Sequence, residues 1–163
     1  MATFEMKQIG VIRSPHKEPK GTPIQPTAAE GYKGTVEVYE DYAEGLQDVE
    51  GFSHIYIVYY FHLIKEMKLK CVPFLDDKER GIFSIRGPAR PNPIGFSIVK
   101  LNKIEKNILH IEDVDVVDGT PLLDIKPYVP EYDQRDECRI GWLEKNVQNL
   151  PDKKDDGRFL GEE

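Results

Sequence analysis

Patterns typical of metal sites and disulfides are nearly absent from this chain. Among its 163 residues there are only two cysteines, Cys71 and Cys138, which lie far apart and form no ligand cluster. The four histidines lack zinc-ligand spacing, either with the cysteines or with one another. We therefore expect no metal site. A bridge between the cysteines remains open, but two isolated thiols are the more ordinary state in a reducing compartment.

Long apolar runs are also missing. The longest, residues 55–63, is interrupted by His62 and is far shorter than the roughly 20 residues that cross a bilayer. The first residues, Met-Ala-Thr-Phe-Glu-Met-Lys, lack the charged-then-apolar layout of an export signal. The sequence thus predicts a protein that does not span a membrane and stays in the cytoplasm.

The chain lacks three of the commonest motifs of enzyme active sites. No G-x-G-x-x-G turn follows a strand, so the usual Rossmann cradle for a dinucleotide or a methyl donor is not encoded. A G-x-x-x-x-G-K-[ST] loop is missing, which argues against a P-loop NTPase, and so is the G-x-S-x-G nucleophile elbow. Any enzymatic function must rest on less common arrangements.

Positive charge is in the minority, but its distribution is uneven. The chain has 22 Lys and Arg against 29 Asp and Glu, a formal charge of -7, which taken alone speaks against a nucleic-acid partner. The negative excess lies wholly after residue 100, whereas residues 7–33 and 65–90 each carry a net charge of +3. These two segments are candidates for an RNA-facing side with modest, salt-sensitive affinity.

Composition and periodicity favour one globular, mainly β domain. With 39% hydrophobic and 31% charged residues, the chain is long enough for a single core. Most segments alternate apolar and polar residues, as half-buried strands do, and Gly, Pro, Asn and Asp separate them. We expect a single-domain β-barrel of about six to seven short strands. The predicted strands are residues 8–13, 35–39, 54–63, 81–86, 96–101 and 108–112, with a further short strand ending at Pro127.

Helical patterns are sparse. Residues 42–46 suit a turn or two, and residues 139–150 have the apolar spacing of a short C-terminal helix that stops at Pro151. The charged residues 152–163 are expected to form a mobile tail. The predicted division is a barrel domain, residues 1–135, followed by a C-terminal helix and charged tail, residues 136–163.

Two proline-stiffened loops carry the most unusual residues. Of 12 prolines, four lie in residues 15–26 and three in residues 88–93, and rigid loops on a barrel are suited to building a site. In the first loop, prolines flank Gln25, whose amide suits a polar ligand. Beside the second, Arg86 and Arg90 offer planar donors for a carboxylate, a phosphate or a stacked base. A plain surface loop and a tight strand connection are the alternatives.

Two further patterns carry less information. In the strand 54–63, His54, Tyr56 and His62 share one face and apolar residues the other, which places His62 at a pocket rim or under a loop. Asp124 and Lys126 point the same way if their strand is extended. They form an ion pair of little energy if exposed, or they hold the ammonium and carboxylate of an amino-acid ligand.

Five strings of residues follow one another at characteristic spacing. They are Gln8-Ile9-Gly10-Val11-Ile12-Arg13-Ser14-Pro15, Gly51-Phe52-Ser53-His54-Ile55, Arg90-Pro91-Asn92-Pro93-Ile94-Gly95, Asp118-Gly119-Thr120-Pro121 and Asp124-Ile125-Lys126-Pro127-Tyr128. Together they resemble the TsaA-like, or TrmO, family. The resemblance spans about residues 7–130, so it is far more specific than any single motif, and residues beyond about 135 carry little of it.

The resemblance implies a β-barrel methyltransferase that uses S-adenosylmethionine and acts as a homodimer on the tRNA anticodon loop. The implied reaction is N6-methylation of N6-threonylcarbamoyladenosine at position 37. At Ile24 and Leu63, where the family commonly has a basic and a polar residue, only backbone contacts are expected. The implied cofactor-binding residues are Ile24, Gln25, Pro26, His62, Leu63, Arg86, Phe96, Asp124, Ile125, Lys126 and Pro127.

The residue types suit this chemistry. The accepting nitrogen belongs to a urea-like group and is a poor nucleophile while it is protonated, so a base or an oxyanion-stabilising cation would help. The catalytic candidates are His62, Arg86 and Asp124.

Four basic residues on or beside the stiff loops are candidates for contacts with RNA phosphates. They are Arg13, Lys17, Lys20 and Arg90. Two other functions remain open: a methyltransferase with a different substrate, and a non-catalytic barrel that senses S-adenosylmethionine or binds RNA.

Overall fold

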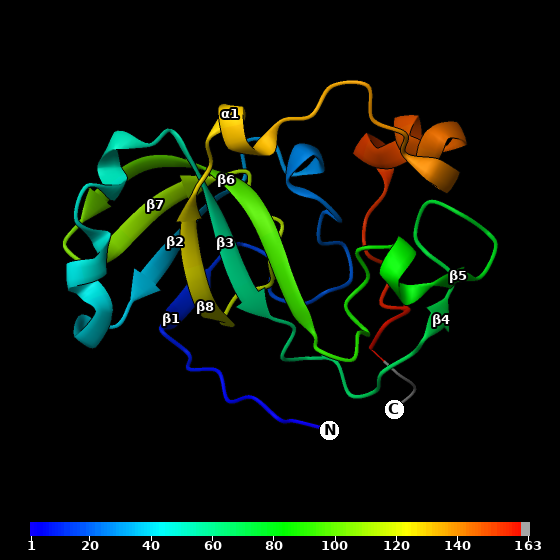
Figure 1. Cartoon of the computed structure of the whole chain (residues 1–163), viewed down its shortest axis with the longest axis horizontal. Coiled ribbons are helices and arrows are strands. Elements are labelled where there is room, and N and C mark those ends of the chain that lie inside the picture. Colours follow the sequence, from blue (N-terminus) through cyan, green and yellow to red (C-terminus); the bar gives the residue numbers. More distant parts are fainter. Residues whose placement is uncertain (161–163) are drawn as a thin grey trace.

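The computed structural model describes residues 1–160 and shows a closed barrel of six antiparallel strands beside a smaller side lobe (Figure 1). The strands follow the order β1-β2-β7-β6-β3-β8, and β8 pairs with β1 to close the barrel. The prediction of a mainly β barrel is confirmed. The division of the chain at residue 135 stays a prediction. The barrel strands are β1 (Gly10–Arg13), β2 (Lys33–Val38), β3 (His54–Tyr60), β6 (Ile94–Glu105), β7 (Ile108–Glu112) and β8 (Thr120–Pro127).

Short helical turns connect the strands. The side lobe contains the ribbon of β4 (Lys70–Cys71) and β5 (Arg80–Gly81), together with the C-terminal segment, which we define as residues 135–160. The turn expected at residues 42–46 lies within η2. The helical elements are η1 (Pro26–Ala28), η2 (Glu40–Leu46), η3 (Val49–Gly51), η4 (Ile82–Ser84), α1 (Pro130–Asp133), η5 (Gly141–Lys145) and η6 (Val147–Asp152), of which α1 is the one α-helix within residues 1–160.

Alternation along the strands fills the barrel with aliphatic side chains. On β3, Ile55 and Ile57 are fully buried and Tyr59 follows them on the same face, as the sequence predicted. Fully burying such a side chain stabilises a fold by about 1.5–3 kcal/mol. A slip of one residue would turn this apolar face outward, so its burial fixes the register of β3 between β6 and β8.

The strand predicted at residues 81–86 is wrong. Only Gly81 belongs to a strand, and Ile82 begins the η4 turn. Ile82 and Ile85 are buried in a second core, where Cys71 and Phe159 also pack. Contacts with the side lobe therefore outweigh the alternating pattern. The sixth barrel strand is instead β8, which starts at Thr120, earlier than the short strand expected before Pro127.

The C-terminal segment also differs from its prediction. Residues 139–150 form no single α-helix, because Gly141 adopts φ +60 and Asn146 leaves the helical region between η5 and η6. The stop expected at Pro151 is wrong too, since η6 continues through it. Residues 152–160 are not a free tail: Phe159 is buried in the second core, and Asp155 exchanges backbone hydrogen bonds with Gly21 and Thr22. Residues 161–163 lie outside the described part.

Candidate active site

A cavity of about 1370 Å³ lies where the barrel meets the side lobe. Its walls come from the mouth of the barrel, the two proline-rich loops and the C-terminal segment, including Trp142 and Leu150. Trp142 is held in place because its Nε1 donates a hydrogen bond to the Ser84 carbonyl at 2.8 Å. Segments distant in sequence thus converge on one space, which is typical of a ligand-binding site.

Gln25, Arg86 and Phe96 meet in this cavity. Arg86 Nη1 donates to Gln25 Oε1 at 3.0 Å, and its guanidinium carbon lies 5.1 Å from the centre of the Phe96 ring. Pro23 and Pro26 flank Gln25, whose backbone is extended at φ -153 and ψ 155. Phe96 points out of the barrel because it alternates with the buried Ser97 on β6. The three side chains present an amide, a cation and an aromatic face.

His62 and Leu63 lie at the rim of the same cavity. β3 ends at Tyr60, and the His62 amide donates to the Tyr60 carbonyl at 2.9 Å, which turns the chain toward the side lobe. Partial burial lowers the pKa of His62, so the neutral imidazole is favoured. A neutral imidazole can accept a proton, and it can also contact a cationic ligand without repulsion.

The second proline-rich loop is shaped by Arg90 and Gly95. Arg90 Nη1 donates to the carbonyls of Ile82, Ile85 and Gly87 at 3.0, 2.8 and 3.3 Å, so it holds the turn that precedes the cavity. A side chain at Gly95 would overlap the ring of Tyr59, which explains glycine there. Arg90 therefore fits the alternative of a tight strand connection that the sequence left open. The Arg86 guanidinium instead faces the cavity.

Asp124 and Lys126 lie apart from this cavity within one chain. Lys126 Nζ is 2.7 Å from Asp124 Oδ2, and about half or more of each side chain is exposed. Asp124 and Phe96 both pair with Val58, from opposite sides, so all three share the outer face of the barrel. Asp124 therefore lies on the face that carries Phe96, but outside the cavity that Gln25 and Arg86 line.

Comparison with known proteins identifies the family of this chain. The model of the tRNA-methyltransferase O N-terminal domain matches residues 11–134. A probable S-adenosyl-L-methionine-binding protein of Pyrococcus abyssi is 56% identical over 94% of this chain and 84% of its own length. The chain belongs to the TrmO N-terminal-domain family.

Other TrmO relatives are longer than this chain. The tRNA (adenine(37)-N6)-methyltransferase of Escherichia coli is 39% identical over 80% of this chain and 60% of that enzyme. The crystal structure of TrmO from Pseudomonas aeruginosa superimposes with a TM-score of 0.72 at 35% identity, covering 86% of this chain and 63% of that one. The chain therefore spans about three fifths of these two relatives.

The structure brings most of the predicted TrmO cofactor residues together. Seven of them line the one cavity: Ile24, Gln25, Pro26, His62, Leu63, Arg86 and Phe96. The other four, residues 124–127, do not line it. Of the predicted RNA contacts, Arg13, Lys17 and Lys20 are exposed, and Lys17 pairs with Asp118 at 2.9 Å. All these roles stay predictions.

Sequence reasoning missed the polar group at the mouth of the barrel, which is formed by Tyr59, Ser97 and Asp115. Tyr59 was assigned to the apolar face of β3. The available signal was Asp115 itself, which is an acidic residue between two valines. Its position facing the cavity depends on the path of the chain after β7.

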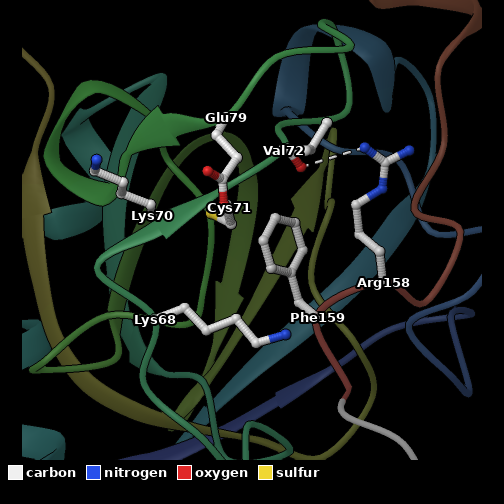
Figure 2. Close-up of a pocket in the computed structure, with 7 residues that line it drawn as sticks. All are labelled: Lys68, Lys70, Cys71, Val72, Glu79, Arg158 and Phe159. Atoms are coloured by element: carbon white, nitrogen blue, oxygen red, sulfur yellow. Dashed lines mark hydrogen bonds between the residues drawn. The ribbon is translucent and has the colours of Figure 1, made fainter.

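A smaller pocket of about 270 Å³ lies in the side lobe (Figure 2). Lys68, Cys71 and Arg158 surround the Phe159 ring, and Arg158 Nη1 donates to the Val72 carbonyl. Burial raises the pKa of the Cys71 thiol, which keeps it protonated and unreactive. Cys71 and Cys138 are both free, so the expectation of two isolated thiols is confirmed.

Within residues 1–160, no helix is long and apolar enough to cross a bilayer. No group of three or more His, Cys, Asp or Glu side chains in that range is arranged to hold a metal ion.

Proposed function

We propose that this chain is an S-adenosylmethionine-dependent methyltransferase that methylates N6 of adenosine 37 in tRNA. The observation that carries the proposal is the meeting of Gln25, Arg86 and Phe96 in one cavity of a TrmO-family barrel. Relatives of 32–39% identity from Escherichia coli and Homo sapiens bear the name of that enzyme.

The cavity fits the methyl donor and a nucleoside together. Ligand pockets usually have volumes of roughly 300–1000 Å³, and this one is larger, at about 1370 Å³. The Phe96 ring suits stacking with an adenine or contact of its face with a sulfonium cation, and the Gln25 amide suits hydroxyl and amino groups. When bound, S-adenosylmethionine supplies an electrophilic methyl group on a sulfonium.

The substrate that we infer is N6-threonylcarbamoyladenosine rather than plain adenosine. Its exocyclic nitrogen is joined to a carbonyl, and its threonyl carboxylate adds a negative charge. Arg86 is the cation of the cavity best placed to interact with either group, since Gln25 uses only one of its guanidinium nitrogens. Most of the rate enhancement would come from holding the nitrogen against the methyl donor, with His62 at the rim as a further polar contact.

The assembly that we infer is a cytoplasmic homodimer in which the partner completes the pocket. Phe96 is 47% exposed, and Asp124 lies on the same outer face. A second copy that covers this face would bring residues 124–127 of each protomer to the cofactor of the other. In that position Asp124 would be a hydrogen-bond acceptor and a catalytic candidate, as predicted from the resemblance.

Methyl transfer from labelled S-adenosylmethionine to purified tRNA tests the function. We expect N6-methyl-N6-threonylcarbamoyladenosine by nucleoside mass spectrometry, formed only on tRNA that carries the threonylcarbamoyl group. Arg86→Ala and His62→Ala should each lower the rate at least about tenfold, whereas the exposed Arg135→Ala serves as the matched control. Cofactor binding without transfer to any tRNA would instead identify a sensor, and transfer to another substrate would correct the reaction.

A further inference from the structure

A chain of hydrogen bonds runs from the barrel core to the cavity. Ser97 Oγ donates to Asp115 Oδ1 at 2.6 Å, and the Tyr59 hydroxyl is 3.0 Å from Ser97 Oγ. Because the only Ser97 hydroxyl proton is used on the carboxylate, the Tyr59 hydroxyl must be the donor to Ser97. β3, β6 and the segment after β7 thus hold Asp115 in a fixed orientation.

The second carboxylate oxygen of Asp115 is open to the cavity. Among residues 1–160, no other residue donates a hydrogen bond to Oδ2 and Asp115 forms no ion pair, so Ser97 and the backbone amide of Asp115 itself are the donors to this carboxylate. Asp115 lines the cavity and is only partly buried, so its carboxylate faces that space. A carboxyl group that faces a largely apolar cavity without a cationic partner in contact is costly, which points to a ligand-directed role.

We propose that Asp115 is the base of the methyl transfer, a role that rests on the proposed function. Its Oδ2 removes the proton of the exocyclic nitrogen as that nitrogen is methylated. Ser97 and Tyr59 are positioning residues, because they orient the carboxylate and leave Oδ2 free.

The step balances in atoms and electrons. The nitrogen uses its electron pair to form the new bond to the methyl carbon, and the carbon-sulfur bond breaks with its pair remaining on sulfur. The product nitrogen no longer bears hydrogen, so one proton must leave it, and this proton passes to Asp115. No oxidant or further reactant is needed, and the proton reaches solvent when the product departs.

The charged surroundings suit such a base. Burial raises the pKa of Asp115 to about 7, although the hydrogen bonds from Ser97 and from its own backbone amide, and the Arg86 charge, lower it. A base is most effective when its pKa lies near the working pH. Tyr59 stays neutral because burial and the Asp115 charge raise its pKa. Asp155, whose pKa burial also raises, and the neutral His62 line the same cavity and are the competing candidates.

Single-turnover methylation of threonylcarbamoylated tRNA, measured across roughly pH 5.5 to 8.5, tests the role. We expect the wild-type rate to rise with pH and to level off near 7, and Asp115→Asn to lose at least about 100-fold. Glu37→Gln, an acid-to-amide change at an exposed position on β2, should keep the wild-type rate. If Asp155→Asn or His62→Ala, and not Asp115→Asn, removes the dependence on pH, the assignment is wrong.

A second readout needs neither cofactor nor tRNA. In protein labelled with ¹³C-carboxyl aspartate, the resonance that Asp115→Asn removes should titrate near pH 7. Ser97→Ala removes a hydrogen bond to the carboxylate, so both this midpoint and the pH at which the rate levels off should rise together. If Asp115→Asn fails to fold, the resonance is identified instead as the one whose midpoint Ser97→Ala shifts, and titration at the ordinary value for aspartate would refute the proposal.

The two proposals can fail separately. A wild-type protein that transfers no methyl group to any tRNA overturns the proposed function, and with it the role of Asp115. A wild-type protein that methylates tRNA at a rate independent of pH, or an Asp115→Asn rate within about threefold of wild type, overturns only the role of Asp115.

Discussion

Asp115 stands between Val114 and Val116, which are 0% and 4% exposed. Burying a carboxyl group beside such neighbours costs stability whenever it is charged. Local rules of this kind are most often broken at functional sites, where stability is given up for activity. Asp115 is therefore the residue at which the requirements of stability and of activity should conflict most clearly.

This conflict predicts a stability change with a defined dependence on pH. The folded protein holds the Asp115 proton up to about pH 7, whereas the unfolded chain releases it near the ordinary value of about 4. The stability contributed by the protonated form is thus complete below about pH 4 and is lost as the pH rises to 7. Asp115→Asn stays neutral, so it should raise the free energy of unfolding by about 2–4 kcal/mol at pH 8 and very little at pH 4.

Urea unfolding of the wild type and of Asp115→Asn at the two pH values measures this difference. Glu37→Gln, at an exposed position on β2, is the control and should show nearly the wild-type stability at both pH values. An equal effect of Asp115→Asn at pH 4 and pH 8 would mean that Asp115 has an ordinary pKa.

The residues that sequence could identify are those that belong to a recognisable string. Gln25 was notable for its flanking prolines and Arg86 for its neighbouring loop, and both line the cavity. Asp115 lies three residues before the string that begins at Asp118, and nothing local distinguishes a cavity-facing aspartate from a solvent-facing one. Its environment is created by Tyr59 and Ser97, which lie 38 residues apart in sequence and meet only when β3 and β6 pair.

At the scale of elements, the alternation of apolar and polar residues predicts a strand correctly only where a neighbouring strand lies in position to pair with it. β1, β2, β3, β6 and β7 were predicted within a few residues, because each has an apolar face that the barrel buries. Residues 81–86 also alternate apolar and polar side chains. Their apolar side chains are buried in the side lobe, however, so the segment forms the η4 turn instead of a strand. That lobe depends on Phe159, more than 70 residues later, and no local pattern shows this contact.

Phe159 offers a direct test of the C-terminal segment as a structural element. Its ring packs against Phe74 with centroids 5.1 Å apart, and the side chain is 6% exposed. Phe159→Ala should therefore lower the free energy of unfolding by about 3–5 kcal/mol and loosen the wall of the cavity that Trp142 and Leu150 form. The affinity for S-adenosylmethionine should fall with it.

Chemical denaturation and calorimetric titration of the cofactor check both effects. Phe4→Ala is the matched control, because Phe4 is 84% exposed and its removal should change neither quantity. If Phe159→Ala unfolds like the wild type, residues 152–160 form the free tail that their charge pattern predicted.

At the scale of the whole molecule, net charge and local charge give opposite answers about RNA. The chain carries -7, yet the two segments with net positive charge contain the loops that build the cavity, and Arg86 of one bonds Gln25 of the other. A tRNA that places position 37 in the cavity would therefore approach these two segments, although Asp113, Asp133 and Asp155 also line the cavity. Electrostatic attraction at these segments is local, so binding should be modest and readily screened.

Affinity for tRNA should thus fall steeply with salt, while affinity for the cofactor should hardly change. Each phosphate neutralised by a basic residue adds about 0.7–0.9 to the slope of log affinity against log salt concentration. The double variant Lys17→Ala, Lys20→Ala should reduce that slope by about 1–2 and weaken binding at low salt most. Lys103→Ala, outside both basic segments and paired with Glu105, should leave the slope unchanged. Filter binding across a salt series measures it, and an equal slope in all three proteins would place the RNA on another face.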